Sequence, residues 1–518
     1  MNKSLLERLL DYYQIDYPEY LKLTSPVDFT NFASGHQFDD IDKAVNLVKE
    51  VIAKKGKIII YGDYDADGVM GTSILVKMFE YLDVVVDYYL PNRYVDGYGI
   101  NLEHAQEYVD KKYDLVITVD NGITAFEPIE ILHNNGVKVL ILDHHQVAES
   151  VPVADAICHP TYSHFGETAS SGAFTAFMFS IALLGRVDKY LATLAAISLI
   201  SDMMPLLDYN RNLLRAVIKE YKHGEFLAID LLGDNEPFNE TLIGMKIAPR
   251  INSIGRLCED DSINKIVEYF ISKDKEFILN YYSFILENNE ARKQISKIDI
   301  DGLDVSDSKK AIVIKGDYKE GIIGLVANSL MVKHHVPVIV FSFNNNGVIK
   351  GSGRCPEGCD IVDIFAHLED LIITSGGHAL AGGCSIYEKD YEEFKKRFIS
   401  YAETIVYTKP EYKTIDLGIN EFSLENYELV NSFGPFGESW TAPLFKMRRI
   451  RVDILTYSRD HKHIITTIGN RQKLIYFNYP QEVLENAKYI DVIGSLGKKI
   501  YQGNVYLEFN IKEVEPTE

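Results

Sequence analysis

Cysteines and long apolar runs are scarce in this sequence. Its 518 residues include only five cysteines and one tryptophan. Five scattered cysteines indicate reduced thiols rather than a disulfide framework. The sequence has no run of eighteen apolar residues, so it predicts no membrane span. Its first residues also lack the apolar stretch of a signal peptide. We therefore expect a cytoplasmic protein, a monomer with no membrane partner.

Basic residues are also scarce relative to acidic ones. Lys and Arg number 53 against 75 Asp and Glu, which gives a formal net charge of −22. Nucleic-acid-binding proteins are usually basic, so this balance argues against broad adhesion to duplex DNA but leaves room for a narrow basic groove. Cys355 and Cys359 could form half of a zinc site, but no second cysteine pair accompanies them, and a loop is the favoured interpretation.

The most informative segment that is present is a short acidic turn. Asp63, Asp65 and Asp67 alternate directly after the apolar run 58–60 and before a predicted helix over 69–79. Three carboxylates this close repel one another and raise each other's pKa, and a divalent cation bound by their oxygens would remove that repulsion. A solvated polar turn is the alternative interpretation.

Two further predicted strands end in the same way, one at Asp120 and the other at Asp143, His144 and His145. An apolar predicted helix delivers one more acid, Asp202, near its end. Ligands of open α/β sheets bind at the carboxyl ends of the strands. A mixed set of Asp and His ligands suits Mn²⁺, Mg²⁺ or Zn²⁺. The sequence therefore predicts a metal site at this edge of a sheet.

The order and spacing of these acids and histidines resemble the four motifs of the DHH phosphoesterase family. Within that family the sequence is most similar to the RecJ-like single-stranded-DNA-specific exonucleases, from about residue 28 to the C-terminus. The further segments that carry the resemblance are Pro91-Asn-Arg93, Gly97-Tyr-Gly99, Ser171-Gly-Ala173, Ala248-Pro-Arg-Ile-Asn252, Gly255-Arg-Leu257, Glu320-Gly-Ile-Ile-Gly324, Gly351-Ser-Gly-Arg354 and Ser375-Gly-Gly-His-Ala379 with Ala381-Gly-Gly383.

The resemblance implies a metal-dependent 5′→3′ exonuclease that hydrolyses single-stranded DNA in repair and recombination, with two divalent ions, Mn²⁺ or Mg²⁺. A single-strand-binding protein or a helicase is the protein partner it suggests. It assigns Asp143 to orienting a ligand histidine and His145 to the scissile phosphate or to proton transfer. The implied metal ligands are Asp65 and Asp120, with Asp63 nearby, for one ion, and Asp67, Asp120, His144 and Asp202 for the other.

A second group of residues is predicted to bind the substrate. Gly376, Gly377 and His378 belong to a glycine-rich predicted turn, and small residues let backbone N–H groups approach phosphate oxygens, although a plain tight turn is the alternative. The resemblance implies the other roles: Ser352, Arg354 and Arg93 grip the 5′ end, Tyr98 stacks on a terminal base, and Arg250, Asn252 and Arg256 contact the strand backbone. A structural salt bridge is the alternative for Arg250.

Alternation of apolar runs and helical periodicity from residue 58 predicts a parallel, doubly wound α/β sheet. Together with the resemblance, it divides the chain into an N-terminal helical arm, 1–37; a DHH catalytic domain, 38–260; a long connecting helix, 261–305; a second α/β, DHH-associated substrate-binding lobe, 306–409; and a C-terminal OB-like β-barrel that binds nucleic acid, 410–518.

The predicted barrel contains the clearest basic cluster of the chain. Basic residues from Lys446 to Lys473 alternate with aromatic ones up to Tyr479. Cations and aromatic rings on short strands suit single-strand binding by attraction to phosphates and stacking on bases. A solvated charged face beside core aromatics is the alternative.

Two other functions remain open at this stage. The first is a DHH phosphodiesterase for short oligonucleotides or cyclic dinucleotides, whose first motif carries a histidine where this sequence has Tyr61. The second is a non-catalytic replication scaffold of the helicase-cofactor branch, whose members tend to lose metal ligands. The sequence also departs from its RecJ-like relatives, because the stretch Asp317–Gly324 lacks their Trp-His pair, and this bears on substrate length.

Overall fold

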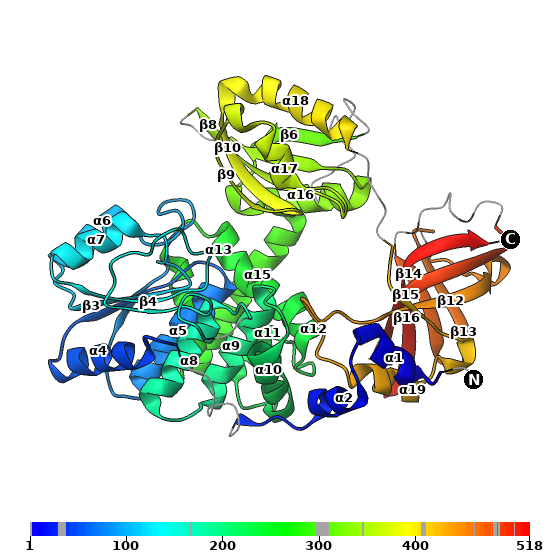
Figure 1. Cartoon of the computed structure of the whole chain (residues 1–518), viewed down its shortest axis with the longest axis horizontal. Helices are drawn as coiled ribbons and strands as arrows, with labels where there is room; N and C mark the ends of the chain where they lie inside the picture. The colour runs from blue at the N-terminus through cyan, green and yellow to red at the C-terminus, as the bar shows by residue number, and fades with distance from the viewer. Residues whose placement is uncertain are drawn as a thin grey trace. The chain divides into compact units, whose positions relative to one another are not determined.

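The chain folds into two compact units, Asp28–Pro410 and the combination of Met1–Val27 with Glu411–Glu518 (Figure 1). No helix among the described residues combines the length and the apolar character needed to cross a membrane. The computed structural model describes residues 3–29, 38–165, 168–296, 310–343, 347–405, 411–459, 461–477, 479, 484, 487–501 and 503–517.

The first lobe of the larger unit contains a five-stranded parallel sheet in the order β2-β1-β3-β4-β5, which confirms the predicted fold class. The central strands are buried over their whole length because helices cover both faces, as their continuous apolar runs predicted. The strands are β1 (Ile58–Tyr61), β2 (Asp87–Tyr89), β3 (Leu115–Val119), β4 (Lys138–Leu142) and β5 (Ala156–Cys158).

Alternate strand residues divide between the two faces of this sheet. Val116 and Val139 pack with α6 and α7 in one core, and α5 and α8 lie on the other side (Figure 1). The helices of this lobe are α4 (Ile41–Ala53), α5 (Ala66–Glu80), α6 (Leu102–Asp110), α7 (Phe126–Asn134), α8 (Gly172–Leu184), α9 (Lys189–Ser201), α10 (Asp208–Glu220), α11 (Leu227–Leu232), α12 (Glu240–Leu242), a π-helical turn at Ile243–Ile247, α13 (Ala248–Leu257) and α14 (Lys265–Ile271).

A long helix, α15 (Lys275–Ser296), runs from the first lobe toward the second (Figure 1). The predicted connecting helix over 261–305 is shorter in the structure, because the separate helix α14 occupies Lys265–Ile271. Residues 297–305 of the predicted connecting segment lie outside the described part of the chain. The second lobe is a five-stranded mixed sheet in the order β6-β7-β8-β10-β9. Its elements are β6 (Ile312–Gly316), α16 (Glu320–His334), β7 (Val338–Ser342), β8 (Val348–Arg354), α17 (Ile361–Ala366), β9 (Ile372–His378), β10 (Ala381–Tyr387) and α18 (Tyr391–Thr404).

The glycine-rich segment of this lobe is a pair of strands, so the predicted turn over its glycines is wrong. Gly376, Gly377 and His378 end β9, and β10 follows in antiparallel register, with Gly382 opposite Gly377. A Cβ atom on Gly382 would lie 2.9 Å from the ring of Phe365. The glycines therefore let the sheet pack closely against α17, a tertiary demand that local sequence does not reveal.

The smaller unit is a six-stranded sheet in the order β11-β12-β15-β16-β14-β13. Its pairs are antiparallel except β11 with β12 and β14 with β16. Its elements are β11 (Thr414–Asp416), α19 (Leu424–Asn431), β12 (Leu444–Arg451), β13 (His463–Gly469), β14 (Gln472–Phe477), β15 (Tyr489–Tyr501) and β16 (Asn504–Thr517).

The N-terminal helices α1 (Leu5–Tyr13) and α2 (Tyr17–Thr24) belong to this smaller unit. Leu9 is fully buried in its core, and the Tyr13 ring stacks on Trp440 with centroids 4.5 Å apart. In chain order, the two α/β lobes are therefore inserted between the two parts of the smaller unit. Residues 30–37 of the predicted arm lie outside the described part of the chain.

Candidate active site

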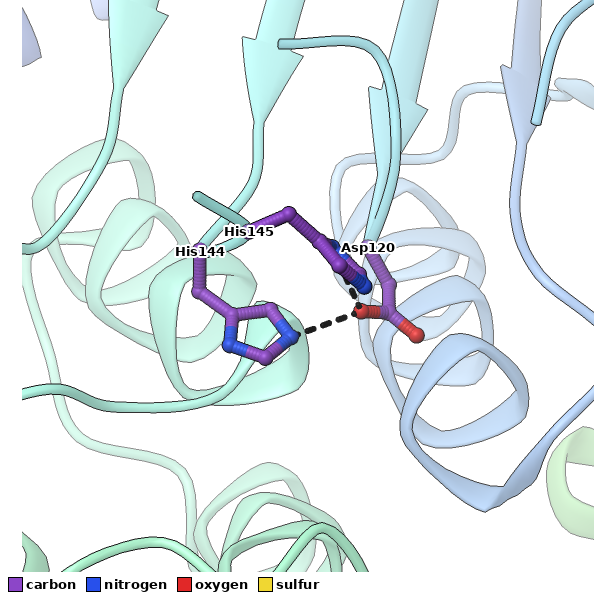
Figure 2. A group of neighbouring side chains, drawn as sticks. All are labelled: Asp120, His144 and His145. Carbon is purple, nitrogen blue, oxygen red and sulfur yellow. Dashed lines mark hydrogen bonds and ion pairs between the residues drawn. The ribbon is translucent and has the colours of Figure 1, made fainter. Parts of the chain in front are cut away.

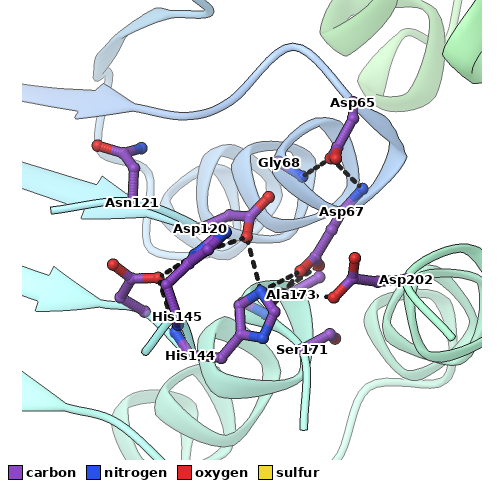
Figure 3. A network of polar contacts seen from close by, with 12 residues as sticks. Asp65, Asp67, Gly68, Asp120, Asn121, His144, His145, Ser171, Ala173 and Asp202 are labelled. Carbon is purple, nitrogen blue, oxygen red and sulfur yellow. Dashed lines mark hydrogen bonds and ion pairs between the residues drawn. The ribbon is translucent and has the colours of Figure 1, made fainter. Parts of the chain in front are cut away.

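The acidic motifs meet at one edge of the parallel sheet because β1, β3 and β4 are neighbours and all end there (Figure 3). Asp120 follows β3 with φ of 62°, a left-handed conformation that turns the chain sharply at the strand end. A Cβ atom on Gly172 would lie 2.7 Å from Asp120 Cα. Only glycine at the start of α8 lets that helix approach the end of β3 so closely.

The side chains form three groups with ligand atoms within 4.8 Å of one another. His144 is central, because its Nε2 atom lies 3.0 Å from Asp120 Oδ1, 3.4 Å from Asp67 and 3.5 Å from Asp202. Figure 2 shows the two histidine rings facing Asp120. The groups are Asp63, Asp65 and Asp120; Asp67, His144 and Asp202; and Asp120, His144 and His145. The first group contains the residues expected for one ion. The second contains those expected for the other ion except Asp120, whose Oδ1 lies 3.0 Å from His144 Nε2.

The electrostatics of this cluster fit divalent cations. Burial and neighbouring carboxylates raise the pKa of Asp63 and of Asp120, and they raise the pKa of Asp202 to about 8. Asp63 Oδ1 and Asp202 Oδ2 are buried and accept no hydrogen bond from the described residues. Buried carboxylate oxygens without a partner are costly, and bound cations would satisfy them.

Two helix N-termini hold the acidic turn in place. Asp65 caps α5, where its Oδ1 accepts from the backbone N–H groups of Asp67 at 3.0 Å and of Gly68 at 3.2 Å. Asp67 in turn accepts from the N–H groups of Gly172 at 2.7 Å and Ala173 at 2.8 Å, at the start of α8 (Figure 3). The backbone N–H groups at the N-termini of both helices thus fix the positions of these two carboxylates.

Asp143 and His145 form a separate ion pair beside the cluster. Asp143 Oδ1 lies 2.8 Å from His145 Nδ1 and accepts from the backbone N–H of His144 at 2.7 Å. Burial alone would raise the pKa of Asp143, but the hydrogen bond and charge of His145 lower it to about 2. Burial opposes the charge of His145, yet Asp143 raises the pKa of His145 to about 9. Asp143 thus orients His145, while His144 faces the acids.

Two tyrosines lie near the cluster in different ways. The Tyr98 hydroxyl donates to the carbonyl of Asp120 at 3.1 Å and lies 2.9 Å from His145 Nε2. The Tyr61 hydroxyl donates to the carbonyl of Gly99 at 3.1 Å and lies 3.1 Å from His104. Tyr61, which stands where small-substrate DHH enzymes carry a histidine, is therefore engaged elsewhere, whereas Tyr98 touches the site directly.

A cavity of about 820 Å³ opens beside Tyr98 and is lined by both lobes. The first lobe contributes Tyr64, Arg93, Gly97, Tyr98 and Arg256. The second lobe contributes residues of α16, β8, β9 and β10, namely Glu320, Gly321, Ile323, Gly324, Lys350, Gly351, Ser352, Arg354, Thr374, Ser375, Gly376, Gly383, Cys384 and Ser385. Tyr64, Lys350 and Ser385 were not expected from the sequence. Tyr64 did carry a signal, because it is an aromatic residue inside the acidic turn.

Three guanidinium groups converge on this cavity, and among the described residues none of them forms an ion pair with a carboxylate. Arg93 stacks 4.1 Å from the centroid of the Tyr64 ring, and its Nε atom is buried without a hydrogen-bond partner. Arg256 donates to the carbonyl of Gly321 at 3.0 Å, and burial, together with the charge of Arg93, lowers its pKa to about 10. Arg354 donates to Ser352 Oγ at 3.0 Å. Such a cluster favours an anionic ligand.

The remaining expected substrate contacts lie in other settings. Arg250 makes a bidentate pair with Asp234, with both N–O distances 2.9 Å, and also donates to the carbonyl of Leu232. Asn252 accepts from the backbone N–H of Ala66 at 2.7 Å and so braces the acidic turn. Gly376 lines the cavity, whereas Gly377 and His378 continue β9 outside the lining residues.

Three family models match successive parts of the chain. They are the DHH family N-terminal domain at residues 57–199, the DHHA1 domain at 307–404 and the RecJ OB domain at 415–513. Proteins named single-stranded-DNA-specific exonuclease RecJ from Haemophilus influenzae and Bacillus subtilis are each 28% identical over 99% of this chain. The matches cover 96% and 68% of those two proteins, respectively.

Solved structures show the same architecture. RecJ from Thermus thermophilus in complex with Mn²⁺ matches 99% of this chain and 78% of that one with a TM-score of 0.83 and 24% identity. An exonuclease RecJ bound to manganese matches 72% of this chain and 96% of that one with a TM-score of 0.61 and 28% identity. A DHH domain followed by a DHHA1 domain makes the chain a member of the DHH family. Within that family it is a RecJ-like protein, because the smaller unit matches the RecJ OB domain.

Proposed function

We propose that this protein is a metal-dependent exonuclease that degrades single-stranded DNA from its 5′ end. The observation that carries the proposal is the contact of Tyr98 with both parts of the site. Tyr98 lines the cationic cavity, and its hydroxyl donates to the backbone carbonyl of Asp120, whose side chain belongs to the acidic cluster. A strand end held in the cavity would therefore place a nearby phosphodiester against the metal ligands. The names of the relatives support single-stranded DNA as the substrate.

Two divalent ions, Mn²⁺ or Mg²⁺, would be held by the two ligand sets that meet at Asp120. Such a pair supplies an activated water and neutralises charge on the reacting phosphate. Asp143 raises the pKa of His145 to about 9, and the positive charge of the protonated ring would attract a phosphate oxygen. Tyr98 fixes the position of the His145 ring, because its hydroxyl lies 2.9 Å from Nε2.

The cavity would bind the 5′-terminal phosphate. Arg354 and Ser352 are joined by a hydrogen bond on β8, and Arg93 reaches the same cavity from the first lobe. Gly324 of α16 lies against both β8 side chains, since a Cβ atom there would be 2.8 Å from Arg354 Nη2 and 3.1 Å from Ser352 Oγ. A guanidinium fork and a hydroxyl recognise phosphate with direction. The smaller unit would hold more distant parts of the strand.

The test is digestion of one single-stranded oligonucleotide labelled at either end in separate samples with Mn²⁺. We expect the 5′ label to be released first as a mononucleotide, and chelation with EDTA should stop the release. Release of the 3′ label first would contradict the proposed polarity. Rapid cleavage of trinucleotides with no cleavage of long strands would favour the small-substrate alternative, and metal binding without cleavage of either would favour the scaffold.

A further inference from the structure

The outer face of the second-lobe sheet carries three parallel rows of side chains across β8, β10 and β9. Residues directly opposite one another in antiparallel strands point to the same face, and so do residues two apart along one strand. The register therefore places the rows on a single face, with Arg354, Ala381 and His378 in the first, Ser352, Gly383 and Gly376 in the second, and Lys350, Ser385 and Thr374 in the third.

The third row extends the cavity beyond the expected phosphate site. Lys350, Ser385 and Thr374 all line the cavity, one row farther along the sheet than Ser352. Two residues along a strand correspond to about 6.6 Å. Within the row of Ser352, β10 and β9 carry glycines, so no side chain of these two strands lies beside Ser352, and the third row is the next one on this face. The cavity is thus not closed behind a phosphate bound at Ser352 and Arg354.

The chemistry of the third row suits additional phosphate groups. It offers one ammonium group and two hydroxyls, which are donors to phosphate oxygens. Lys350 Nζ is paired with Glu320 Oε2 at 2.9 Å, but its side chain remains 51% exposed. Among the described lining residues, Glu320 is the only one with a carboxylate, and it begins α16. An incoming phosphate could therefore replace Glu320 as the partner of Lys350.

We propose that the cavity accepts strands whose 5′ end carries a diphosphate or triphosphate, with the terminal phosphates bound by Lys350, Ser385 and Thr374. This inference rests on the proposed function, because the phosphate nearest the sugar would sit at Ser352 and Arg354. Glu320 weakens the binding of a 5′ polyphosphate, because its negative charge repels the added phosphates and it competes with them for Lys350.

The reaction leaves the 5′ polyphosphate intact. One water adds to the phosphorus of the first internucleotide linkage, and the bond between that phosphorus and the 3′ oxygen breaks. The released nucleotide keeps its triphosphate and gains a 3′ hydroxyl after protonation of the leaving oxygen. The shortened strand begins with a 5′ monophosphate. The first product is therefore a nucleoside triphosphate, which is distinct from every later product.

The experiment compares strands of one sequence with a 5′ triphosphate, monophosphate or hydroxyl group, using full-length protein with Mn²⁺. Chromatography of the first product should show an intact nucleoside triphosphate from the triphosphate strand. If the protein degrades the monophosphate strand but does not degrade the triphosphate strand, the inference is wrong and the proposed function is still supported. Failure to degrade the monophosphate strand would instead overturn the proposed function.

Two variants and a control assign the effect to the third row. Lys350→Met should lower the ratio of triphosphate to monophosphate cleavage about tenfold, the loss expected for one charged hydrogen bond. Glu320→Gln should raise that ratio. Lys396→Met, an exposed lysine on α18 away from the cavity, should leave it unchanged. The ratio of triphosphate-strand to monophosphate-strand affinity, measured at equilibrium in EDTA, tests the inference without cleavage. An equal effect of Lys350→Met on both strands would overturn it.

Discussion

Two cationic regions of this molecule differ in what faces their positive charges. In the cavity of the larger unit, Arg93, Arg256 and Arg354 contact an aromatic ring, a carbonyl and a hydroxyl. On β12 of the smaller unit, Arg448 pairs with Asp416 at 2.8 Å, and Arg451 pairs with Asp453. Lys446 of the same strand also pairs with Glu515. One region keeps its donors available for an anion, and the other has already used many of them.

The comparison explains how a chain with net charge −22 can bind a polyanion. Basic residues that lie beside acids on an exposed strand attract phosphate weakly, because each acid offsets the charge of its partner and salt screens exposed charges. Guanidinium groups that share a cavity without carboxylate partners repel one another, and a phosphate relieves that repulsion. The position of the positive charges, and not their number, therefore indicates where an anionic ligand would bind.

The largest effect is expected from a substitution that removes an expected metal ligand and leaves both cationic regions intact. Asp120→Asn should lower the cleavage rate about a thousandfold, because it removes a ligand common to both expected metal sets. Asparagine tolerates the left-handed backbone of residue 120, so the fold should persist. Binding to single-stranded DNA, measured by fluorescence anisotropy, should change little. Near-normal cleavage by this variant would contradict the two-metal interpretation.

A matched pair of arginine variants tests the comparison itself. Arg354→Ala should lower kcat/KM on a 5′-phosphorylated strand by about ten- to a hundredfold, because a charged hydrogen bond to phosphate is lost. Arg448→Ala should lower it by about threefold or less, since that guanidinium is already paired with Asp416. The loss for Arg354→Ala should shrink on a 5′-hydroxyl strand. Equal losses for the two variants would remove the distinction between the regions.

The smallest effect concerns the pH dependence of stability in EDTA. Burial and the charge of Asp67 raise the pKa of Asp202 to about 8 in the folded state, against about 3.9 when unfolded. An acid with a raised folded pKa stabilises the fold below its unfolded pKa, and that contribution is lost as pH rises through the folded pKa. The Tm should therefore fall as the pH rises from about 4 to about 8, which are the pKa values of Asp202 in the unfolded and folded states.

Asp202→Asn should flatten this fall, and Mn²⁺ should reverse it. Asp83→Asn serves as the control, because Asp83 is exposed and lies on a left-handed turn that asparagine tolerates. Differential scanning fluorimetry in EDTA measures all three proteins. A Tm that does not depend on pH in the wild-type protein would mean that the acids do not repel one another.

The sequence predicted the acid cluster well because strand ends and their polar residues are local features. Apolar runs followed by Asp63, Asp120 and Asp143 specify both a parallel sheet and the edge where the acids meet. The pairing of Asp143 with His145 and the engagement of Arg250 by Asp234 depend on side-chain positions that spacing does not determine. Lys350 was missed because cross-strand register on β8 and β10 brings it to the cavity.

The relation between the ends of the chain also depends on tertiary structure. Leu9 of α1 is buried in the core formed with residues 411–518, and nothing in its local sequence indicates that partner. A variant that ends near residue 409 would expose this leucine. A test of the two lobes alone should therefore remove residues 1–27 together with residues 411–518.

Anomalous scattering of Mn²⁺ in crystals of the protein would locate the bound metal ions. We expect two peaks in the acidic cluster, both near Asp120. One peak should contact Asp63 and Asp65, and the other should contact Asp67, His144 and Asp202, in agreement with the two ligand groups. A single peak, or two peaks away from Asp120, would show that this cluster does not bind a pair of metal ions.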